Sequence, residues 1–589
     1  MRLHRLLALI TLGTFMASPA LAQQDRSQAR SMVISEGGIV AAEQPLAAQI
    51  GAAVLASGGN AVDAAVATNA AMGVLVPMSN GIGGDLFAIV YEAKSGKLYG
   101  VNASGWAPKN LTPEHLAEKG ATKMPGRGID SVTVPGTVAG WDMLLARFGR
   151  KTLKEALSPS IALAERGFPV TEFVHDLWAA SEKTLAADPD AAHLYLPEGH
   201  APAVGEIFRN PDLAQSYREI AIGGRNAFYK GPIAVQIVAA SKAHGGTMTL
   251  ADLAQYDAEW ATPLSINYRG WTVYEMPPNG QGIAALEMLN IMETFPLSDW
   301  GHNSAKSLHA MIEAKKLAYA DMIRFDADPH FAKMPLMRLL SKNFAQERAK
   351  AIDPAHAACN VGPATELAGA DTIYLSVVDR DGNMVSLIQS NFASVGFGSG
   401  VVAAGAGFAL QNRGGLFSLD PKSPNLLAGH KRPVHTIIPA FMEKGDQRIA
   451  FGIMGGWNQS QAHAQFVSNV VDFHMNIQAA LEAARFSKDT FQGCDVQIED
   501  RVPAEVREQL TTLGHEIQLR GDFAPAATGG GQAMLRDFAT GVNYGASDPR
   551  KDGEAVPQPP VLKTVSEGAA PAPQSAPHRR RSPAQAPAD

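Results

Sequence analysis

Cysteine and charged residues are scarce in this chain of 589 residues. Cys359 and Cys494 are the only two cysteines, and charged residues make up 18% of the sequence. The 16 histidines are scattered without HExxH or CxxC spacing, so the sequence predicts no metal site and no cofactor. The net charge is −7 and the body of the chain has no basic stripe, which argues against nucleic acid as a partner.

Long apolar runs are confined to the N-terminus. Residues 1–22 begin with Arg2 and Arg5, continue with an apolar run and end in Ala20-Leu21-Ala22, a pattern typical of a signal peptide cut after Ala22. The alternative is an uncleaved anchor, for which the run is short. We expect an exported protein, periplasmic or secreted, without stable membrane insertion.

Helical and strand patterns follow one another over most of the chain. The sequence predicts a strand over 38–42, helices over 43–57 and 61–75 with Asn60 as the second N-cap, and a strand over 86–92. A glycine-rich loop, 80–85, lies between the second helix and the second strand. Because it precedes a strand and does not open a helix, we reject a phosphate-binding role for it.

The middle and the end of the chain differ in character. Residues 141–360 are predicted to be mostly helical, with a clear helix over 304–324 and a strand over 271–275. Residues 353–370 break the helical pattern and predict a flexible arm. After residue 556 the sequence is rich in proline, alanine and serine, which is typical of a disordered tail over 557–589.

A β-hairpin is predicted around the sequence TIYLSVVDRDGN. Residues from Thr372 onward alternate with a period of two, and Asp381-Gly382 supplies a turn signal. With these two residues as the loop, Thr372 faces Asn391, and Ser390 is one step away. A bulge would shift the register by one residue, so we consider Ser390 and Asn391 together. A threonine at a strand start is by itself an ordinary structural feature.

Four motifs, in the same order along the chain, indicate that this threonine has more than a structural role. The TIYLSVVDRDGN run resembles the start of the small subunit of γ-glutamyltranspeptidases, which are N-terminal-nucleophile hydrolases. The segment GGIVAAEQPLAAQIGAAVLASGGNAVDAAVATNAAMGVLVPMSNGIGGDLFAIVY resembles the start of their large subunit. SVTVPGTVAGW and YGASDPR match again, so the resemblance covers about residues 37–550.

The resemblance implies a fold and a processing event. The fold would be α+β, a four-layer αββα sandwich with two sheets packed face to face and helices outside. The precursor would cut itself between Asp371 and Thr372 into a large subunit, 23–371, and a small subunit, 372–556. A disulfide between Cys359 and Cys494 would then tether the two, although two separate buried thiols fit the sequence equally well.

The catalytic machinery is also implied by the resemblance. Freed Thr372 would be the nucleophile and its own α-amine the base, because a hydroxyl is a weak nucleophile without a base beside it. An α-amine with an ordinary pKa of about 7.7–8.0 is partly neutral at physiological pH. Ser390 and Asn391 would support the threonine. Gly455-Gly456, in FGIMGGWNQ, would supply the oxyanion hole.

The expected substrate contacts depart from the family pattern at three places. The paired serines that hold the substrate α-carboxylate fall on His435 and Thr436, which keep some polar recognition. The residues that grip the α-amino group fall on Arg413 and Leu416, which would repel or ignore an ammonium group. The arginine that pairs with the carboxylate falls on Ser104.

Three functions remain open on this evidence. The leading hypothesis is a self-processing γ-glutamyl amide hydrolase or transferase, with water or an amino acid as the acceptor and glutathione as the family's default substrate. The second is an acylase or amidohydrolase for a substrate without the α-amine, such as a glutaryl or cephalosporin-type amide, which Arg413 and Leu416 favour. The third is an inactive envelope binding protein, against which the intact Thr372 and glycine pair speak.

Overall fold

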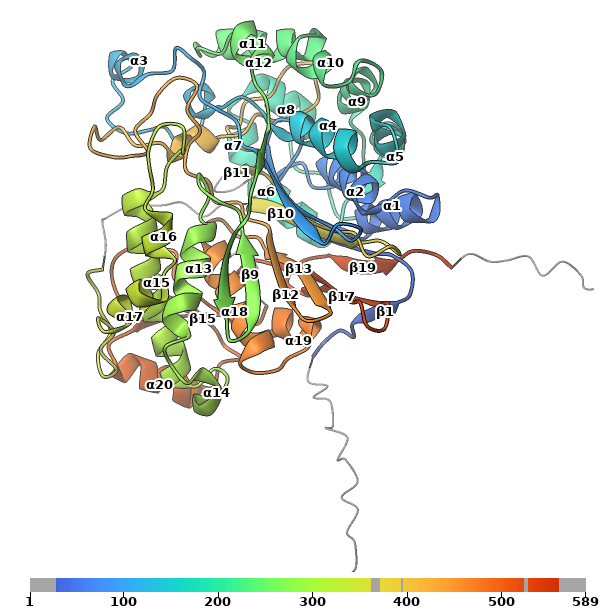
Figure 1. Cartoon of the computed structure of the whole chain (residues 1–589). Coiled ribbons are helices and arrows are strands. Elements are labelled where there is room, and N and C mark those ends of the chain that lie inside the picture. The colour runs from blue at the N-terminus through green and yellow to red at the C-terminus, as the bar shows by residue number, and fades with distance from the viewer. Residues whose placement is uncertain (1–27, 362–370, 393–395, 524–527, 561–589) are drawn as a thin grey trace, which may run out of the picture.

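The computed structural model describes residues 28–361, 371–392, 396–523 and 528–560. Its centre is a pair of seven-stranded antiparallel sheets that pack face to face (Figure 1). The upper sheet has the order β19-β2-β10-β11-β3-β4-β7, and the lower sheet has the order β1-β18-β17-β13-β12-β9-β8. This four-layer αββα sandwich confirms the predicted α+β fold.

The strands of the two sheets come from both halves of the chain. The upper sheet contains β2 (Ile39–Ala42), β3 (Asp85–Glu92), β4 (Lys97–Ala103), β7 (Glu259–Ala261), β10 (Asp371–Val378), β11 (Met384–Phe392) and β19 (Glu554–Pro557). The lower sheet contains β1 (Val33–Ser35), β8 (Leu264–Tyr268), β9 (Trp271–Glu275), β12 (Ala440–Lys444), β13 (Gln447–Ile453), β17 (Gly531–Asp537) and β18 (Val542–Ser547). Segments before and after Thr372 therefore share both sheets.

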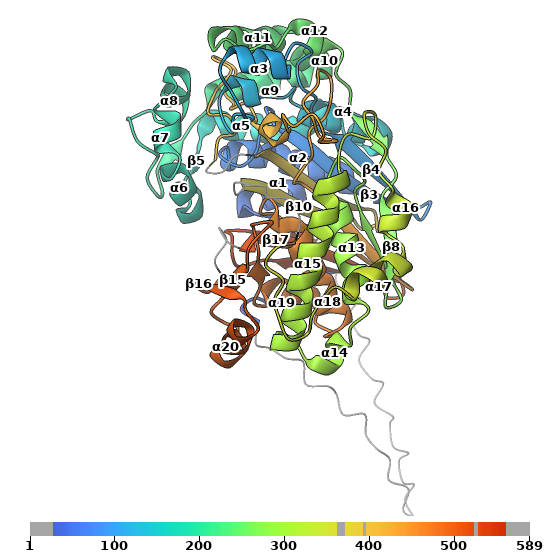
Figure 2. The same cartoon turned by 90° about the vertical axis from the view of Figure 1, so that its left-hand side faces the viewer.

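Helices cover the outer face of each sheet (Figures 1 and 2). Above the upper sheet lie α1 (Pro45–Ala56), α2 (Ala61–Leu75), α4 (Thr137–Phe148) and α5 (Leu153–Arg166). Further out are α3 (Pro113–Glu118), α6 (Glu172–Ala179), α7 (Glu182–Leu185), α8 (Pro189–Tyr195), α9 (Pro211–Gly223), α10 (Arg225–Tyr229), α11 (Pro232–Ala243) and α12 (Leu250–Ala254).

The lower sheet is covered by a second group of helices. These are α13 (Gly282–Met292), α15 (Ala305–Phe325), α18 (Asn458–Val471) and α19 (Ile477–Glu482), with α14 (Leu297–Trp300), α16 (Leu336–Leu339), α17 (Lys342–Ala349) and α20 (Ala504–Thr512) around them. Two small sheets complete the fold: β14 (Phe486–Ser487), β15 (Asp495–Glu499) and β16 (Glu516–Arg520), and β5 (Phe168–Pro169) with β6 (Ile207–Phe208).

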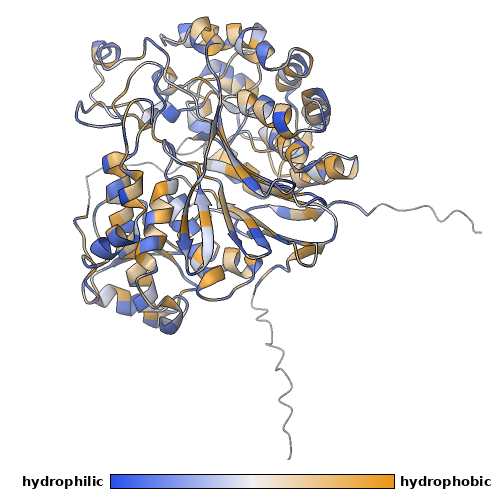
Figure 3. Ribbon diagram, in the orientation of Figure 1, coloured by the Kyte–Doolittle hydropathy of each residue, from blue (hydrophilic) through white to orange (hydrophobic). Residues whose placement is uncertain are grey.

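Three apolar cores fill the three interfaces between the four layers, and apolar residues concentrate there (Figure 3). Strand β10 contributes to two of them because its side chains alternate between its faces. Ile373, Leu375 and Val377 pack against the upper helices, whereas Tyr374 and Val378 lie between the sheets. Thr372 has the parity of Tyr374, which places the threonine on the face between the two sheets.

Most predicted elements are confirmed with small shifts of their ends. Helix α2 spans Ala61–Leu75 as predicted, and Asn60 caps it in a capping box with Asp63. Strand β9 spans Trp271–Glu275, and α15 begins and ends one residue later than predicted. None of the helices in the described ranges is long and apolar enough to cross a membrane. The predicted signal peptide and almost all of the predicted tail lie outside the described residues.

Candidate active site

Strands β10 and β11 bring Thr372 and Ser390 together. The Thr372 Oγ1 hydroxyl donates a hydrogen bond to Ser390 Oγ at 3.1 Å, and the Phe392 N–H donates to the same oxygen at 2.8 Å. Both hydroxyl side chains are fully buried. Ser390 is thus placed to orient the threonine hydroxyl.

The hairpin turn differs from its prediction by one residue. The Asp379 N–H donates to the Asn383 carbonyl, so the loop has three residues, Arg380 to Gly382, and Gly382 takes the positive φ of 87°. Pairing continues as Ile373 with Gln389, and the register shifts between Asp371 and Ile373. The predicted register is therefore wrong by one residue from Ile373 to Val378, whereas Asp371 pairs with Phe392 as that register requires. The bulge for which the sequence left room falls at Thr372, and the threonine side chain contacts Ser390.

The glycine-rich loop before β3 packs on the end of β11. A Cβ atom at Gly84 would lie 2.4 Å from the Ser390 carbonyl oxygen and 2.4 Å from Asn391 Oδ1, so only glycine permits this approach. The Asn391 N–H donates to the Ser79 carbonyl at 3.0 Å, and the Asn391 carbonyl accepts from the Asn412 N–H at 3.2 Å. Asn391 therefore joins the glycine loop to the segment that carries Arg413.

Asp85, at the end of this loop, is a residue that the sequence analysis missed. Its Oδ1 accepts hydrogen bonds from the Gly105 N–H and from Gln411 Nε2, both at 2.8 Å. Its Oδ2 lies 2.7 Å from His435 Nε2 and 3.7 Å from Arg413 Nε. Each of the three predicted departures from the family's substrate contacts is thus represented at this buried carboxylate. His435 and Arg413 contact it directly, and Gly105 is the residue after Ser104.

Arg413 begins a short 3-10 turn, Arg413–Leu416, and its side chain is fully buried. Arg413 Nη1 donates to Thr436 Oγ1 at 2.7 Å, and the guanidinium carbon lies 4.6 Å from the centre of the Phe392 ring. Within the described ranges, Nη2 has no hydrogen-bond partner. Burial lowers the pKa of Arg413 to about 9, and the negative charge of Asp85 opposes this shift. Leu416 is partly buried and packs on the lower apolar core.

His435 is a neutral partner of Asp85. Burial, and then the charge of Arg413, lower the pKa of His435 to about 4, while Asp85 raises it. A neutral imidazole that donates through Nε2 to the carboxylate leaves Nδ1 as an acceptor. This buried Nδ1 has no hydrogen-bond partner among the described residues.

Ser104 is fully buried, and its contacts hold the backbone next to Asp85. Its hydroxyl accepts from Asn279 Nδ2 at 3.1 Å, and its carbonyl accepts from Arg432 Nε at 3.0 Å. The next residue, Gly105, donates its N–H to Asp85. Ser104 therefore lies close to the other substrate-binding candidates, and its hydroxyl is already engaged by an asparagine.

Gly455 and Gly456 follow β13 with φ values of 133° and 57°, which favour glycine. The Gln281 side-chain amide donates to the Gly456 carbonyl at 2.7 Å and to the Thr436 carbonyl. This amide ties the glycine pair to Thr436, whose side chain contacts Arg413. In the described part of the chain, neither glycine N–H donates a hydrogen bond, as an oxyanion hole requires.

Asp371 is paired through its backbone with Phe392 in the uncut chain. The residues immediately before it, 362–370, lie outside the described ranges. The predicted flexible arm over 353–370 is thus described only in its first part. Residues of that part are fastened to the body of the protein, contrary to the prediction for them.

The fastening of this segment includes a disulfide between Cys359 and Cys494, a pairing that the sequence left open. Ala357 donates its N–H to the Leu513 carbonyl at 2.7 Å, and Lys316 Nζ donates to the Ala358 carbonyl at 2.8 Å. Cys359 precedes Thr372 and Cys494 follows it. The disulfide therefore bonds the two predicted subunits to each other.

Reduction is expected to be required for separating the two subunits under denaturing conditions. Wild-type protein should run as one species without a reductant and as two with it, whereas Cys494→Ser should give two in both cases. Closing a loop between residues 135 apart in sequence contributes about 2–5 kcal/mol to the stability of the uncut chain. Denaturing gels and chemical unfolding of uncut protein measure these effects. Equal behaviour of wild type and variant would contradict the assignment.

Buried His309, Glu313 and His515 place their ligand atoms within 4.8 Å of one another. Glu313 Oε1, however, accepts from Lys316 Nζ at 2.7 Å, and His309 Nδ1 lies 2.8 Å from His515 Nε2. His309 Nε2 is 2.8 Å from the Asp353 carbonyl. Because a lysine already supplies the cation, we interpret this cluster as a hydrogen-bond network that fastens the segment before Cys359.

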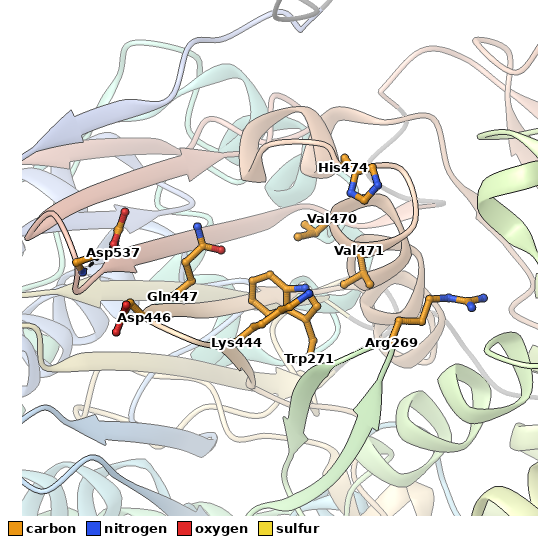
Figure 4. A pocket seen from close by; sticks show the side chains of 10 residues that line it. Arg269, Trp271, Lys444, Asp446, Gln447, Val470, Val471, His474 and Asp537 are labelled. Atoms are coloured by element: carbon orange, nitrogen blue, oxygen red, sulfur yellow. Dashed lines mark hydrogen bonds between the residues drawn. The ribbon is translucent and has the colours of Figure 1, made fainter. Parts of the chain in front are cut away.

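A cavity of about 630 Å³ lies at the turn ends of the lower sheet (Figure 4). Its lining includes Trp271, Lys444 and Gln447 but none of the predicted site residues. Gln447 begins β13 and the glycine pair follows its end, roughly 20 Å away at a rise of about 3.4 Å per residue. This cavity is therefore separate from the candidate active site.

The chain is similar in sequence to known proteins over most of its length. The family model described as gamma-glutamyltranspeptidase matches residues 47–558. The chain belongs to the γ-glutamyltranspeptidase family. It is 38% identical to the glutathione hydrolase-like YwrD proenzyme of Bacillus subtilis over 89% of this chain and 99% of the relative. It is 34% identical to the oxamate amidohydrolase proenzyme of Klebsiella pneumoniae, over 89% and 98%.

Among solved structures, the chain is similar to a cephalosporin acylase from Bacillus halodurans. The sequence identity is 42%, the TM-score is 0.85, and the match covers 92% of this chain and 99% of the acylase. The family is one of N-terminal-nucleophile hydrolases, and its members here include glutathione hydrolases, an amidohydrolase and acylases. Membership therefore makes the chain an enzyme of hydrolase type made as a precursor. It does not identify the acyl group of the substrate, because the family members act on different ones.

Proposed function

We propose that this chain is a self-processing amidohydrolase that accepts acyl groups ending in a carboxylate and lacking an α-amine. The observation that carries the proposal is the buried Arg413 guanidinium beside Phe392, with Nη2 unpartnered among the described residues. A guanidinium is suited to a carboxylate, and the same positive charge repels an ammonium group. A dicarboxylic monoamide satisfies both conditions.

The Asp85 carboxylate is not free to bind the α-ammonium group of a γ-glutamyl substrate. Both Asp85 oxygens are occupied by donors from Gly105, Gln411 and His435. Leu416, at the other clamp position, offers no charge. A γ-glutamyl substrate would therefore bring its ammonium group toward Arg413 without a free anion to receive it.

Processing begins at the Asp371–Thr372 bond in this proposal. The Thr372 hydroxyl, oriented by Ser390, attacks the Asp371 carbonyl carbon and forms an ester, while the hydroxyl proton passes to the peptide nitrogen, which leaves as the neutral α-amine. Water then hydrolyses the ester, which releases the Asp371 carboxyl group and restores the hydroxyl. The freed amine lies on the same residue as the hydroxyl that it must activate.

Substrate turnover uses the same hydroxyl. The α-amine takes the hydroxyl proton as Oγ1 attacks the amide carbon, and the glycine pair stabilises the negative oxygen. The amine proton passes to the departing nitrogen, the C–N bond breaks, and an acyl-threonine ester remains. Water, activated by the same amine, hydrolyses the ester; an amino acid in place of water would give transfer.

Amides with a shared p-nitroaniline leaving group test the proposal. Glutaryl and γ-glutamyl amides differ only in the α-amine, and glutaryl and valeryl amides differ only in the terminal carboxylate. We expect kcat/KM for the glutaryl amide to exceed both others by about 10- to 150-fold, because a charged hydrogen bond contributes about 1.5–3 kcal/mol. Oxalyl, malonyl and succinyl amides then set the chain length. Faster turnover of the γ-glutamyl amide would overturn the proposal.

γ-Glutamyl hydrolysis and transfer is the second candidate. It is favoured by relatives such as the glutathione hydrolase proenzyme of Escherichia coli, 32% identical over 88% of this chain. The same panel decides between the two candidates, with glycylglycine added as an acceptor to separate transfer from hydrolysis.

We also propose that the enzyme works outside the cytoplasm. The signal-peptide pattern of residues 1–22 supports export, and the disulfide between Cys359 and Cys494 supports an oxidising compartment. Fractionation of the source cells, with the N-terminal sequence of the exported large subunit, tests this; a start before Ala22 would contradict it.

A further inference from the structure

Asp85 joins four separate segments at the candidate site. It receives the Gly105 N–H from the loop after β4, Gln411 Nε2 from the segment after β11, and His435 Nε2 from the segment before β12. Arg413 Nε faces the same Oδ2 at 3.7 Å. The carboxylate itself is fully buried, so its partners replace water entirely.

These contacts fix the side chains of Arg413 and His435 at the candidate site. Arg413 lies between Asp85, which forms an ion pair with Nε at 3.7 Å without a hydrogen bond, and Thr436 Oγ1, which accepts from Nη1. Nη2 has neither kind of partner among the described residues. His435 is held as the tautomer that donates from Nε2, because the carboxylate can only accept. Its Nδ1 is thereby kept as an acceptor.

The charges at the site also make Arg413 depend on Asp85. An isolated guanidinium is costly to bury, and an adjacent carboxylate offsets that cost. Asp85 and Arg413 together are neutral, so a substrate carboxylate adds one negative charge to a balanced pair. Without Asp85, Arg413 would lose both its orienting partner and the charge that opposes its desolvation.

We propose that Asp85 is a positioning residue for acyl-group specificity, which holds Arg413 and the tautomer of His435 so that the site prefers a terminal carboxylate. This rests on the proposed function, because it concerns the same carboxylate-bearing amides. It differs from a purely structural role in one respect: a change at Asp85 must alter the preference between substrates and must do more than lower the amount of active enzyme.

The substitution Asp85→Asn preserves size and keeps an acceptor for the Gly105 N–H, but its amide group turns a donor toward His435 and Arg413. We expect the ratio of kcat/KM for glutaryl over valeryl amide to fall about tenfold or more, with the loss concentrated in KM for the glutaryl substrate. Asp472→Asn is the matched control, because Asp472 is another buried carboxylate, held by Tyr268 at 2.6 Å and Ser468 at 2.7 Å. It should lower stability and leave the ratio unchanged.

A second pair of variants keeps the inference testable if Asp85→Asn fails to fold. His435→Gln can still donate to Asp85 and should retain most of the preference for glutaryl amide, whereas His435→Leu leaves Oδ2 without its closest donor and should lose it. Equal losses on both substrates in Asp85→Asn, or equal ratios in the two His435 variants, would overturn the positioning role. Wild type that shows no preference for glutaryl amide would refute the proposed function instead, so the two failures are distinguishable.

Discussion

Replacing Thr372 by alanine is expected to leave the chain uncut and to lower amide hydrolysis by about 10⁴-fold or more, since loss of a nucleophile removes the covalent route. Thr372 Oγ1 is the buried hydroxyl that Ser390 orients, at the start of the strand that the predicted cleavage would free. Mass spectrometry of the purified variant measures processing, and the amide panel measures activity.

Thr372→Ser is the matched control for this prediction. It keeps the hydroxyl and, after cleavage, the adjacent amine, and it loses one methyl group. We expect slower processing and measurable hydrolysis. Full processing or near wild-type hydrolysis in Thr372→Ala would show that another residue is the nucleophile.

Replacing Arg413 by methionine is expected to remove the preference for a terminal carboxylate. Methionine is unbranched and fills part of the buried space, while Asp85 keeps its donors from Gly105, Gln411 and His435, so the fold should survive. Loss of a charged hydrogen bond of about 1.5–3 kcal/mol should lower kcat/KM for glutaryl amide by about 10- to 150-fold. Valeryl amide should change much less, and γ-glutamyl amide should improve relative to glutaryl amide.

Arg413→Lys separates the charge from the shape of the guanidinium. A lysine keeps the positive charge but cannot contact Thr436 and a substrate carboxylate in the same fork geometry. Its losses should fall between those of wild type and Arg413→Met. A uniform loss on all three amides in Arg413→Met would mean that Arg413 stabilises the fold and does not select the substrate.

Strand β10 and the helix after Asn60 could be predicted from the sequence because both depend on local patterns. Alternation over β10 and the capping box at Asn60 are set by neighbours within a few residues, and both are confirmed. The family resemblance supplied the four layers. The predicted hairpin register is wrong by one residue from Ile373 to Val378, since a three-residue loop closed by Gly382 and a two-residue loop have similar sequence signals.

The sequence missed the residues that organise the site from a distance. Asp85 ends the glycine-rich loop 80–85, whose sequence argues against phosphate binding and gives no sign of a role for the carboxylate. Its importance depends on partners such as Arg413 and His435, more than three hundred residues further along the chain. Gln281 was missed for the same reason, because its amide joins two carbonyls that only the folded sheets bring together.

The pairing of Cys359 with Cys494 was equally inaccessible to the sequence. A disulfide requires two Cα atoms a few ångströms apart, and only the folded chain shows the separation of 4.7 Å. The same fold makes the network of His309, Glu313 and His515 visible, whose third member comes from a distant segment.

The N-terminal sequence of the smaller fragment tests the central claim most directly. Wild-type protein, purified, matured and reduced, should give two chains, of which the smaller begins with Thr372 and carries a free α-amine. A smaller chain that begins at another residue, or a single chain that stays uncut after maturation, would contradict the assignment of Thr372 as the N-terminal nucleophile.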